Sequence, residues 1–238
     1  MTRDLSEMPP NTMDTQSDPQ QIHSYEEKDR LYYSLIRRDI LDLIPIGTMR
    51  LLDVGCGMGD TGLAAKQSVG VREVVGVELF EVAAEAAKSK LDHVIIGDIE
   101  QLRLDYTHGY FDCILCADVL EHTRDPWGVL RKLRDFLDDD GLLIASIPNV
   151  RHIVPLLKIV FDRLEYEESG ILDKTHLRFF TLHTIRQMFQ QTGYTIFRIR
   201  TNRSKSWKFK LLNIFSFGIM RQFSVYQYII LARKVLPA

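Results

Sequence analysis

The sequence LLDVGCGMGDTG at residues 51–62 decides the fold of this chain. A run of apolar residues ends in a turn with four closely spaced glycines, and a helical pattern follows at once. Glycine permits a sharp turn and lets a ligand approach the backbone where a helix begins. The stretch therefore predicts a strand, a turn and a helix, with a ligand bound where the strand ends.

Strand and helix patterns alternate outward from this turn. We predict strands at 49–54, 73–78, 93–97, 111–117, 142–147, 194–200 and 226–232, and helices at 25–44, 61–68, 80–90, 127–137 and 181–192. The first five strands are almost continuously apolar, and such strands separated by helices form a parallel sheet covered on both faces. The expected fold class is α/β, doubly wound and Rossmann-like.

The remaining segments define the expected domain organisation. Residues 1–22 are polar and predict a flexible tail, and residues 23–238 predict a single domain. Residues 149–180 lack clean periodicity and predict an insertion after strand five, over the edge of the sheet where a substrate would bind. No export signal or apolar stretch of about 18 residues is present, so we expect a cytoplasmic protein.

Charge is distributed unevenly along the chain. Residues 1–173 hold 18 Lys and Arg against 32 Asp and Glu, whereas residues 174–238 hold 12 Lys and Arg and no acid. Within the second part, residues 203–223 are basic and aromatic, and a helix there would place Trp207 and Phe215 near one face. We expect this segment to contact an anionic membrane peripherally. A helix in a homodimer interface or in the core is the alternative.

Two features resemble metal or redox sites. Cys113 and Cys116 form a CxxC pair, but they lie in a predicted strand, where residues three apart point to opposite faces. We therefore expect buried core cysteines. Asp138–Asp140 are expected in a solvated turn, and the histidines are scattered along the chain, so the sequence predicts no metal site.

Two acids narrow the choice of ligand. Glu78 ends the second strand, where its carboxylate can accept the ribose hydroxyls of an adenosine cofactor. Asp53 lies at the end of the first strand, where it would repel the phosphates of NAD. A carboxylate there suits the ammonium and sulfonium of S-adenosylmethionine. An NAD-dependent oxidoreductase is the alternative, opposed by Asp53 and by the lack of a Tyr–Lys or His–Asp hydride pair.

Four motifs resemble those of the class I S-adenosylmethionine-dependent methyltransferases: LLDVGCGMG, GVELF, GDIEQL and FDCILCADVLEHTRDP. The resemblance implies S-adenosylmethionine as cofactor and a seven-stranded sheet whose last strand is antiparallel. It implies ribose binding by Glu78, adenine binding by Asp98 with Ile99 stacked nearby, and the methionine part beside Ala117 and Asp118. We expect Tyr33 to close over the cofactor. The full set of expected cofactor-binding residues is Asp53, Gly55, Gly57, Glu78, Asp98, Ile99, Ala117, Asp118 and Tyr33.

The downstream motif PNVRH…GILDKTHLRFFT resembles a bacterial subgroup associated with polysaccharide and cell-surface glycan biosynthesis. This resemblance implies a small polar acceptor, such as a sugar or a lipid-linked sugar, methylated on a hydroxyl or an amine. A hydroxyl needs a general base, for which we expect His152 or His176, with His122 as third candidate. A non-catalytic module that binds S-adenosylmethionine is the alternative. Nucleic-acid methylation is not expected, because Asp-Val-Leu-Glu replaces the Asn-Pro-Pro-aromatic motif.

Overall fold

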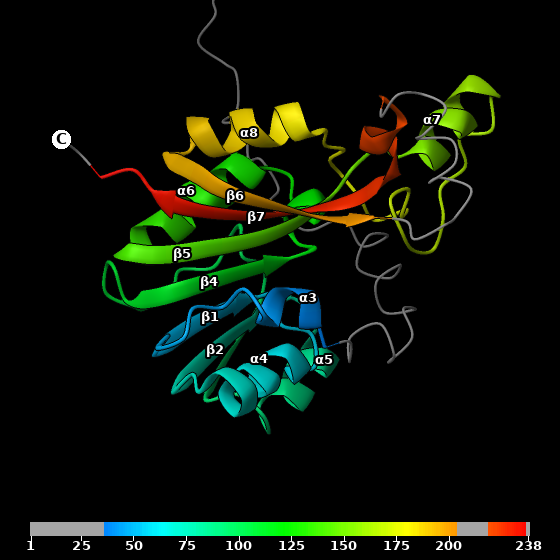
Figure 1. Cartoon of the computed structure of the whole chain (residues 1–238). Coiled ribbons are helices and arrows are strands. Elements are labelled where there is room, and N and C mark those ends of the chain that lie inside the picture. Colours follow the sequence, from blue (N-terminus) through cyan, green and yellow to red (C-terminus); the bar gives the residue numbers. More distant parts are fainter. Residues whose placement is uncertain (1–35, 204–218, 237–238) are drawn as a thin grey trace, which may run out of the picture.

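Seven strands form one sheet in the order β3-β2-β1-β4-β5-β7-β6 (Figure 1). The computed structural model describes residues 36–203 and 219–236. The strands are β1 (Arg50–Val54), β2 (Glu73–Glu78), β3 (His93–Ile96), β4 (Phe111–Ala117), β5 (Leu137–Pro148), β6 (Tyr194–Arg203) and β7 (Val225–Lys234). β1 to β5 are parallel, and β7 pairs antiparallel with both β5 and β6. The expected seven-stranded sheet with an antiparallel last strand is confirmed.

Helices cover both faces of the sheet (Figure 1). On one side lie α3 (Arg38–Leu41), α4 (Asp60–Ala64), which continues as a π-helical turn over Ala65–Val69, and α5 (Glu81–Ala87). On the other side lie α6 (Pro126–Phe136) and α8 (Leu182–Gln191). Successive residues of β1 join different cores, since Leu51 packs in the core on the α3–α5 side and Leu52 in the core on the α6–α8 side. This two-sided burial explains why the strands are almost continuously apolar.

The cysteines are free and buried, as expected. Cys113 packs in the core on the α3–α5 side, whereas Cys116 packs in the core on the α6–α8 side. The two sulfurs of the CxxC pair therefore lie on opposite faces of β4 and do not form a shared site.

The order of the strands creates a crevice beside β1. The chain passes from β1 to β2 and β3 on one side, then crosses back to β4 and β5 on the other. Register pairs Val54 with both Val77 and Cys116, and Glu78 with Ile96, so these parallel strands end near one edge. Open α/β sheets bind ligands at such a reversal of strand order, outside the carboxyl ends of the strands.

The start of β5 differs from the prediction. Asp138–Asp140 were expected in a turn, but they lie within β5, which begins at Leu137. The register against β4 moves from Phe111–Leu137 to Cys113–Leu142, so the extra residues of β5 form an irregularity beside a continuous partner strand. The Lys234 ammonium lies 2.5 Å from the Asp139 carboxylate. Bulging and pairing with a cation let these acids remain in a strand.

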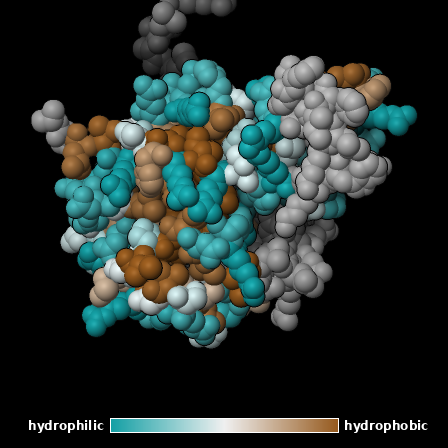
Figure 2. Space-filling view, in the orientation of Figure 1, coloured by the Kyte–Doolittle hydropathy of each residue, from teal (hydrophilic) through white to brown (hydrophobic). Residues whose placement is uncertain are grey.

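The segment after β5 contains a helix that the sequence did not predict. α7 (Ile153–Val160) follows directly, and Ile159, Val160 and the adjoining Phe161 are exposed. Figure 2 shows hydrophobic atoms at the upper right, where Figure 1 places α7. Short 3-10 helices occur at η2 (Leu120–His122) and η3 (Ile219–Ser224).

Some expectations fall on residues that the structure does not describe. They are the flexible tail at 1–22, the position of Tyr33, and residues 204–218 of the basic segment 203–223. Within residues 36–203 and 219–236, no helix has the length and apolarity required to cross a bilayer.

The contact between α4 and the sheet generates a stability prediction. A Cβ at Gly62 would lie 2.6 Å from Leu91 Cδ2 and 2.8 Å from Val74 Cγ1, two buried side chains with little room to move. We expect Gly62→Ala to lower the free energy of unfolding by about 1–3 kcal/mol. Urea denaturation followed by circular dichroism measures the change.

The matched control is Gly128→Ala in α6. A Cβ there meets first the carboxylate of Asp125, an exposed side chain that can rotate away. We expect this variant to be as stable as the wild type or more stable by about 0.4–1 kcal/mol. Equal losses in the two variants would contradict the packing account.

Candidate cofactor and acceptor site

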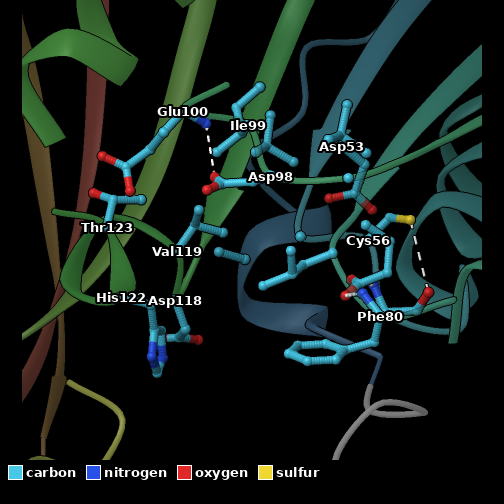
Figure 3. A pocket seen from close by; sticks show the side chains of 18 of the residues that line it. Asp53, Cys56, Phe80, Asp98, Ile99, Glu100, Asp118, Val119, His122 and Thr123 are labelled. Atoms are coloured by element: carbon cyan, nitrogen blue, oxygen red, sulfur yellow. Dashed lines mark hydrogen bonds between the residues drawn. The ribbon is translucent and has the colours of Figure 1, made fainter. Parts of the chain in front are cut away.

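A cavity of about 270 Å³ lies at the carboxyl ends of β1, β2 and β4. Figure 3 shows its walls, with Asp53 and Cys56 on one side and Asp118 and His122 on the other. Every predicted cofactor-binding residue that the structure describes lines this cavity: Asp53, Gly55, Gly57, Glu78, Asp98, Ile99, Ala117 and Asp118. The fold thus brings together residues from segments far apart in the sequence.

The glycine turn shapes one wall. The Gly55 amide donates to the Val77 carbonyl at 2.8 Å, which holds the turn against the end of β2. Gly55 has a φ of +70°, and a Cβ there would lie 2.7 Å from Val119 Cγ2. Only glycine therefore allows the segments after β1 and β4 to approach this closely.

Glu78 is fixed by backbone amides. Its Oε2 accepts from the Gly57 amide at 2.7 Å and its Oε1 from the Phe80 amide at 3.0 Å. Burial raises the pKa of Glu78, and these amides oppose that rise. Each carboxylate oxygen has more than one lone pair, so both can also accept hydroxyl donors from the cavity. This arrangement fits the expected role of binding a ribose.

Asp53 is the uncompensated charge of the site. Its side chain is 3% exposed, and Oδ2 has no hydrogen-bond partner in the described part of the chain. Burial, followed by repulsion from Glu78, raises the pKa of Asp53 to about 7. An unpaired buried carboxylate destabilises a protein unless a cation or a donor reaches it. Asp53 therefore fits a cationic ligand.

The loop after β3 forms the opposite wall. Asp98 accepts from the Glu100 amide at 2.8 Å, drawn as a dashed line in Figure 3. The side chain of Ile99 is buried and lines the cavity. Glu100 accepts from the amides of Arg124 and Asp125 at 2.9 and 2.7 Å, which joins this loop to the segment after β4. An apolar surface beside an acceptor suits an adenine ring and its amino group.

Asp118 anchors a polar network at the far side. Its carboxylate forms an ion pair with Arg37 and accepts from Gln227. Arg37 also donates to Ser146 Oγ at 3.2 Å and forms an ion pair with Asp39 at 3.0 Å. Burial raises the pKa of Asp118, and Arg37 opposes this rise.

Arg37 lines the cavity but was not among the predicted site residues. The only signal available was an arginine near the end of an amphipathic pattern, which reads as a solvated side chain.

Of the three histidines expected to be catalytic, the structure brings His122 and His176 together and places His152 elsewhere. His122 lines the cavity, and its ring centroid lies 4.7 Å from that of His176. His152 is instead the N-cap of α7, where Nδ1 accepts from the Val154 amide at 3.4 Å, and its ring lies against Tyr226. His152 is not among the described residues that line the cavity. Its proposed contact with the acceptor stays a prediction.

Glu121, His122 and His176 form a cluster that the sequence analysis did not anticipate. One ligand atom from each side chain lies within 4.8 Å of the others. Burial and the Asp118 charge raise the pKa of Glu121 well above its usual range. Glu121 and His122 belong to η2 whereas His176 belongs to the segment before α8, and this separation hid the cluster in the sequence.

The raised pKa of Asp53 generates a prediction for the unliganded protein. The folded state holds the Asp53 proton more tightly than the unfolded state, because the pKa rises from 3.8 to about 7 on folding. Its contribution to stability is therefore full below about pH 4 and is lost as the pH rises through about 7. We expect this loss to be smaller in Asp53→Asn by at least about 2 kcal/mol.

Urea denaturation at a series of pH values measures this difference. The exposed Asp105→Asn is the control and should keep the wild-type pH dependence. An Asp53→Asn protein with the wild-type slope would show that Asp53 does not carry the buried charge.

Comparisons with known proteins identify the family of the chain. The model of a family described as "Methyltransferase domain" matches residues 25–199. A demethylmenaquinone methyltransferase of Halalkalibacterium halodurans is 27% identical over 169 residues, covering 63% of this chain and 69% of that protein. A ubiquinone biosynthesis O-methyltransferase of Haemophilus ducreyi is 32% identical over 109 residues, but the match covers only 42% of this chain and 45% of that enzyme. These relatives are named for quinones, so they do not support the glycan subgroup.

Solved structures show the same fold. A SAM-dependent methyltransferase from Archaeoglobus fulgidus superposes with a TM-score of 0.65 at 19% identity, covering 91% of this chain and 100% of that chain. One from Thermotoga maritima gives 0.61 at 18% identity, covering 90% and 97%. Because the family model matches residues 25–199, the chain belongs to the family of methyltransferase domains. It is an enzyme that uses S-adenosylmethionine as its cofactor.

Proposed function

We propose that this enzyme transfers the methyl group of S-adenosylmethionine to a hydroxyl of a small polar acceptor. The observation that carries the proposal is the position of His122 on the cavity wall. Its Nδ1 lies 3.1 Å from the Thr175 carbonyl, which can only accept, so Nδ1 carries the proton and Nε2 is the basic nitrogen. A basic nitrogen at this wall supports an acceptor that must lose a proton.

The cofactor supplies an activated methyl group on a sulfonium. Glu78 and Asp98 would bind its adenosyl part, and Asp53 would compensate its positive charge. The enzyme's main task is then to align the acceptor oxygen with the methyl carbon and to exclude water. The ion pair between Arg37 and Asp118 gives the acceptor side of the cavity a fixed polar wall.

An oxygen acceptor is favoured over an amine for a physical reason. A hydroxyl is a weak nucleophile until its proton is removed, and a positioned imidazole accelerates such a transfer. The relative from Haemophilus ducreyi is named an O-methyltransferase, which agrees with this choice. A quinol and a sugar both offer such a hydroxyl, and the sequence resemblance favours the sugar whereas the relatives favour the quinol.

A panel of acceptors tests the function directly. The full chain is incubated with S-adenosylmethionine and, separately, a catechol, a quinol, nucleotide sugars and lipid-linked sugars. Release of the demethylated cofactor together with a methyl ether on one acceptor supports the proposal. Cofactor binding without turnover on any hydroxyl would favour the non-catalytic module, and methylation of amines alone would refute the oxygen acceptor.

The role of His122 gives a prediction for the turnover number. We expect His122→Ala to lower kcat by about 10²–10⁴-fold while the Kd for S-adenosylmethionine stays within about twofold, because the imidazole acts on the acceptor and not on the cofactor. Steady-state kinetics and calorimetry measure the two quantities. The exposed His183→Ala in α8 is the matched control and should retain wild-type kcat. Unchanged turnover in His122→Ala would exclude His122 from the chemistry.

A further inference from the structure

Two histidines and one glutamate converge beside the cavity, in a combination suited to a metal ion. The ligand atoms of Glu121, His122 and His176 all lie within 4.8 Å of one another. Two imidazoles and one carboxylate are a donor set that zinc and other divalent first-row metals bind in catalytic sites. With three ligands from the part of the chain that the structure describes, such an ion keeps an open coordination position.

Both histidine rings are held by backbone carbonyls. His122 Nδ1 lies 3.1 Å from the Thr175 carbonyl, and His176 Nδ1 lies 3.0 Å from the Ile171 carbonyl. Because a carbonyl oxygen can only accept a hydrogen bond, Nδ1 carries the proton in each ring and Nε2 is the nitrogen that can bind a metal. Hydrogen bonds of this kind typically fix the tautomer and the ring orientation of metal-binding histidines.

The surroundings of His122 are also ordered. The Thr175 hydroxyl lies 3.2 Å from His122 Nδ1 and donates to the buried Asp173 carboxylate at 2.7 Å. This chain of contacts joins η2 to the segment before α8. The Leu177 and Arg178 amides strengthen the junction by donating to the Glu121 carbonyl at 2.8 and 3.0 Å.

The burial of Glu121 is a second, independent observation that points to a cation. Its side chain is 1% exposed, and neither carboxylate oxygen has a hydrogen-bond partner in the described residues. The acids Asp118 and Asp173 act on it electrostatically, and so does Arg37, whose guanidinium is paired with Asp118 and Asp39. A carboxylate buried among other acids is costly unless a cation compensates it.

We propose that Glu121, His122 and His176 bind a divalent transition-metal ion such as zinc, whose open position takes the acceptor hydroxyl. This inference rests on the proposed hydroxyl methylation and gives His122 its specific role, that of a ligand acting through the ion. The substrate class is then an acceptor whose hydroxyl can coordinate a metal.

The ion would favour the chemistry in a defined way. A hydroxyl bound to a divalent ion loses its proton to water more readily, as a zinc-bound water does. The resulting oxygen forms a bond to the methyl carbon while the bond from that carbon to sulfur breaks. The products are a methyl ether, a neutral thioether and the released proton.

Metal binding by the full chain tests the site without relying on activity. Protein treated with chelator and then dialysed is titrated with Zn²⁺ by calorimetry, and with Co²⁺ by its visible absorption. We expect one ion per chain in the wild type and in the His183→Ala control. We expect binding weakened by at least about tenfold in Glu121→Gln, His122→Ala and His176→Ala. No saturable ion in the wild type, or wild-type binding in any of these three variants, overturns the proposal.

Two further measurements keep the outcome decisive. Calorimetry with S-adenosylmethionine shows that each variant still folds with an intact cofactor site, and the Co²⁺ spectrum of the wild type reports nitrogen and oxygen ligation without any mutation. Methyl transfer is then assayed with and without chelator. Loss of transfer that Zn²⁺ restores supports the metal. Transfer that survives chelation but not His122→Ala overturns the metal and leaves the proposed function standing.

Discussion

The hydrogen bond from the Gly57 amide to the Glu78 carboxylate is the contact on which the rest of the site depends. It joins the turn after β1 to the end of the neighbouring strand β2. The turn can approach Glu78 because Gly55, Gly57 and Gly59 adopt positive φ angles, which favour glycine. With the turn held there, Asp53 is buried beside Glu78, and the helix α4 begins at the edge of the cavity.

Burying two carboxylates side by side is costly, and the fold meets that cost unequally. Glu78 is compensated by backbone amides, whereas Asp53 Oδ2 has no partner in the described part of the chain. The same contrast recurs across the cavity, where Asp118 is paired with Arg37 but the carboxylate of Glu121 has no hydrogen-bond partner among residues 36–203 and 219–236. The two uncompensated acids mark the two places where we assign a positive charge, the cofactor and the metal ion. Such sites commonly trade stability for function.

Much of the fold could be predicted from local pattern alone. The bounds of β2 and β4 match the predicted strands residue for residue, because continuous apolar runs between turn residues leave few alternatives. The predicted start of β5 was wrong. Asp138–Asp140 look like a turn in the sequence, but they lie within β5, at an irregularity in its pairing with β4. Helix α7 was not predicted because its exposed residues are also apolar, so the sequence shows no alternation between an apolar and a polar helix face.

The two halves of the site differed in how far they could be predicted. The wall that carries Asp53 and Glu78 follows strand ends in chain order, so these two acids could be located from their spacing to the glycine turn. Asp98 was expected only from the resemblance to the methyltransferase motifs. The other half depends on tertiary contacts among Arg37, Asp118 and Gln227, and on the meeting of His122 with His176. No local pattern encodes these contacts. His152 was expected ahead of His122 as the general base, but in the fold it caps α7.

Calorimetric titration of the purified chain with S-adenosylmethionine, its demethylated product and NAD, in parallel, tests the central claim most directly. The buried Asp53 carboxylate should admit the cationic cofactor and repel the pyrophosphate. The account predicts saturable binding of the first two ligands and none of NAD. Binding of NAD alone would contradict it, because a phosphate-bearing ligand would then occupy the place that Asp53 reserves for a positive charge.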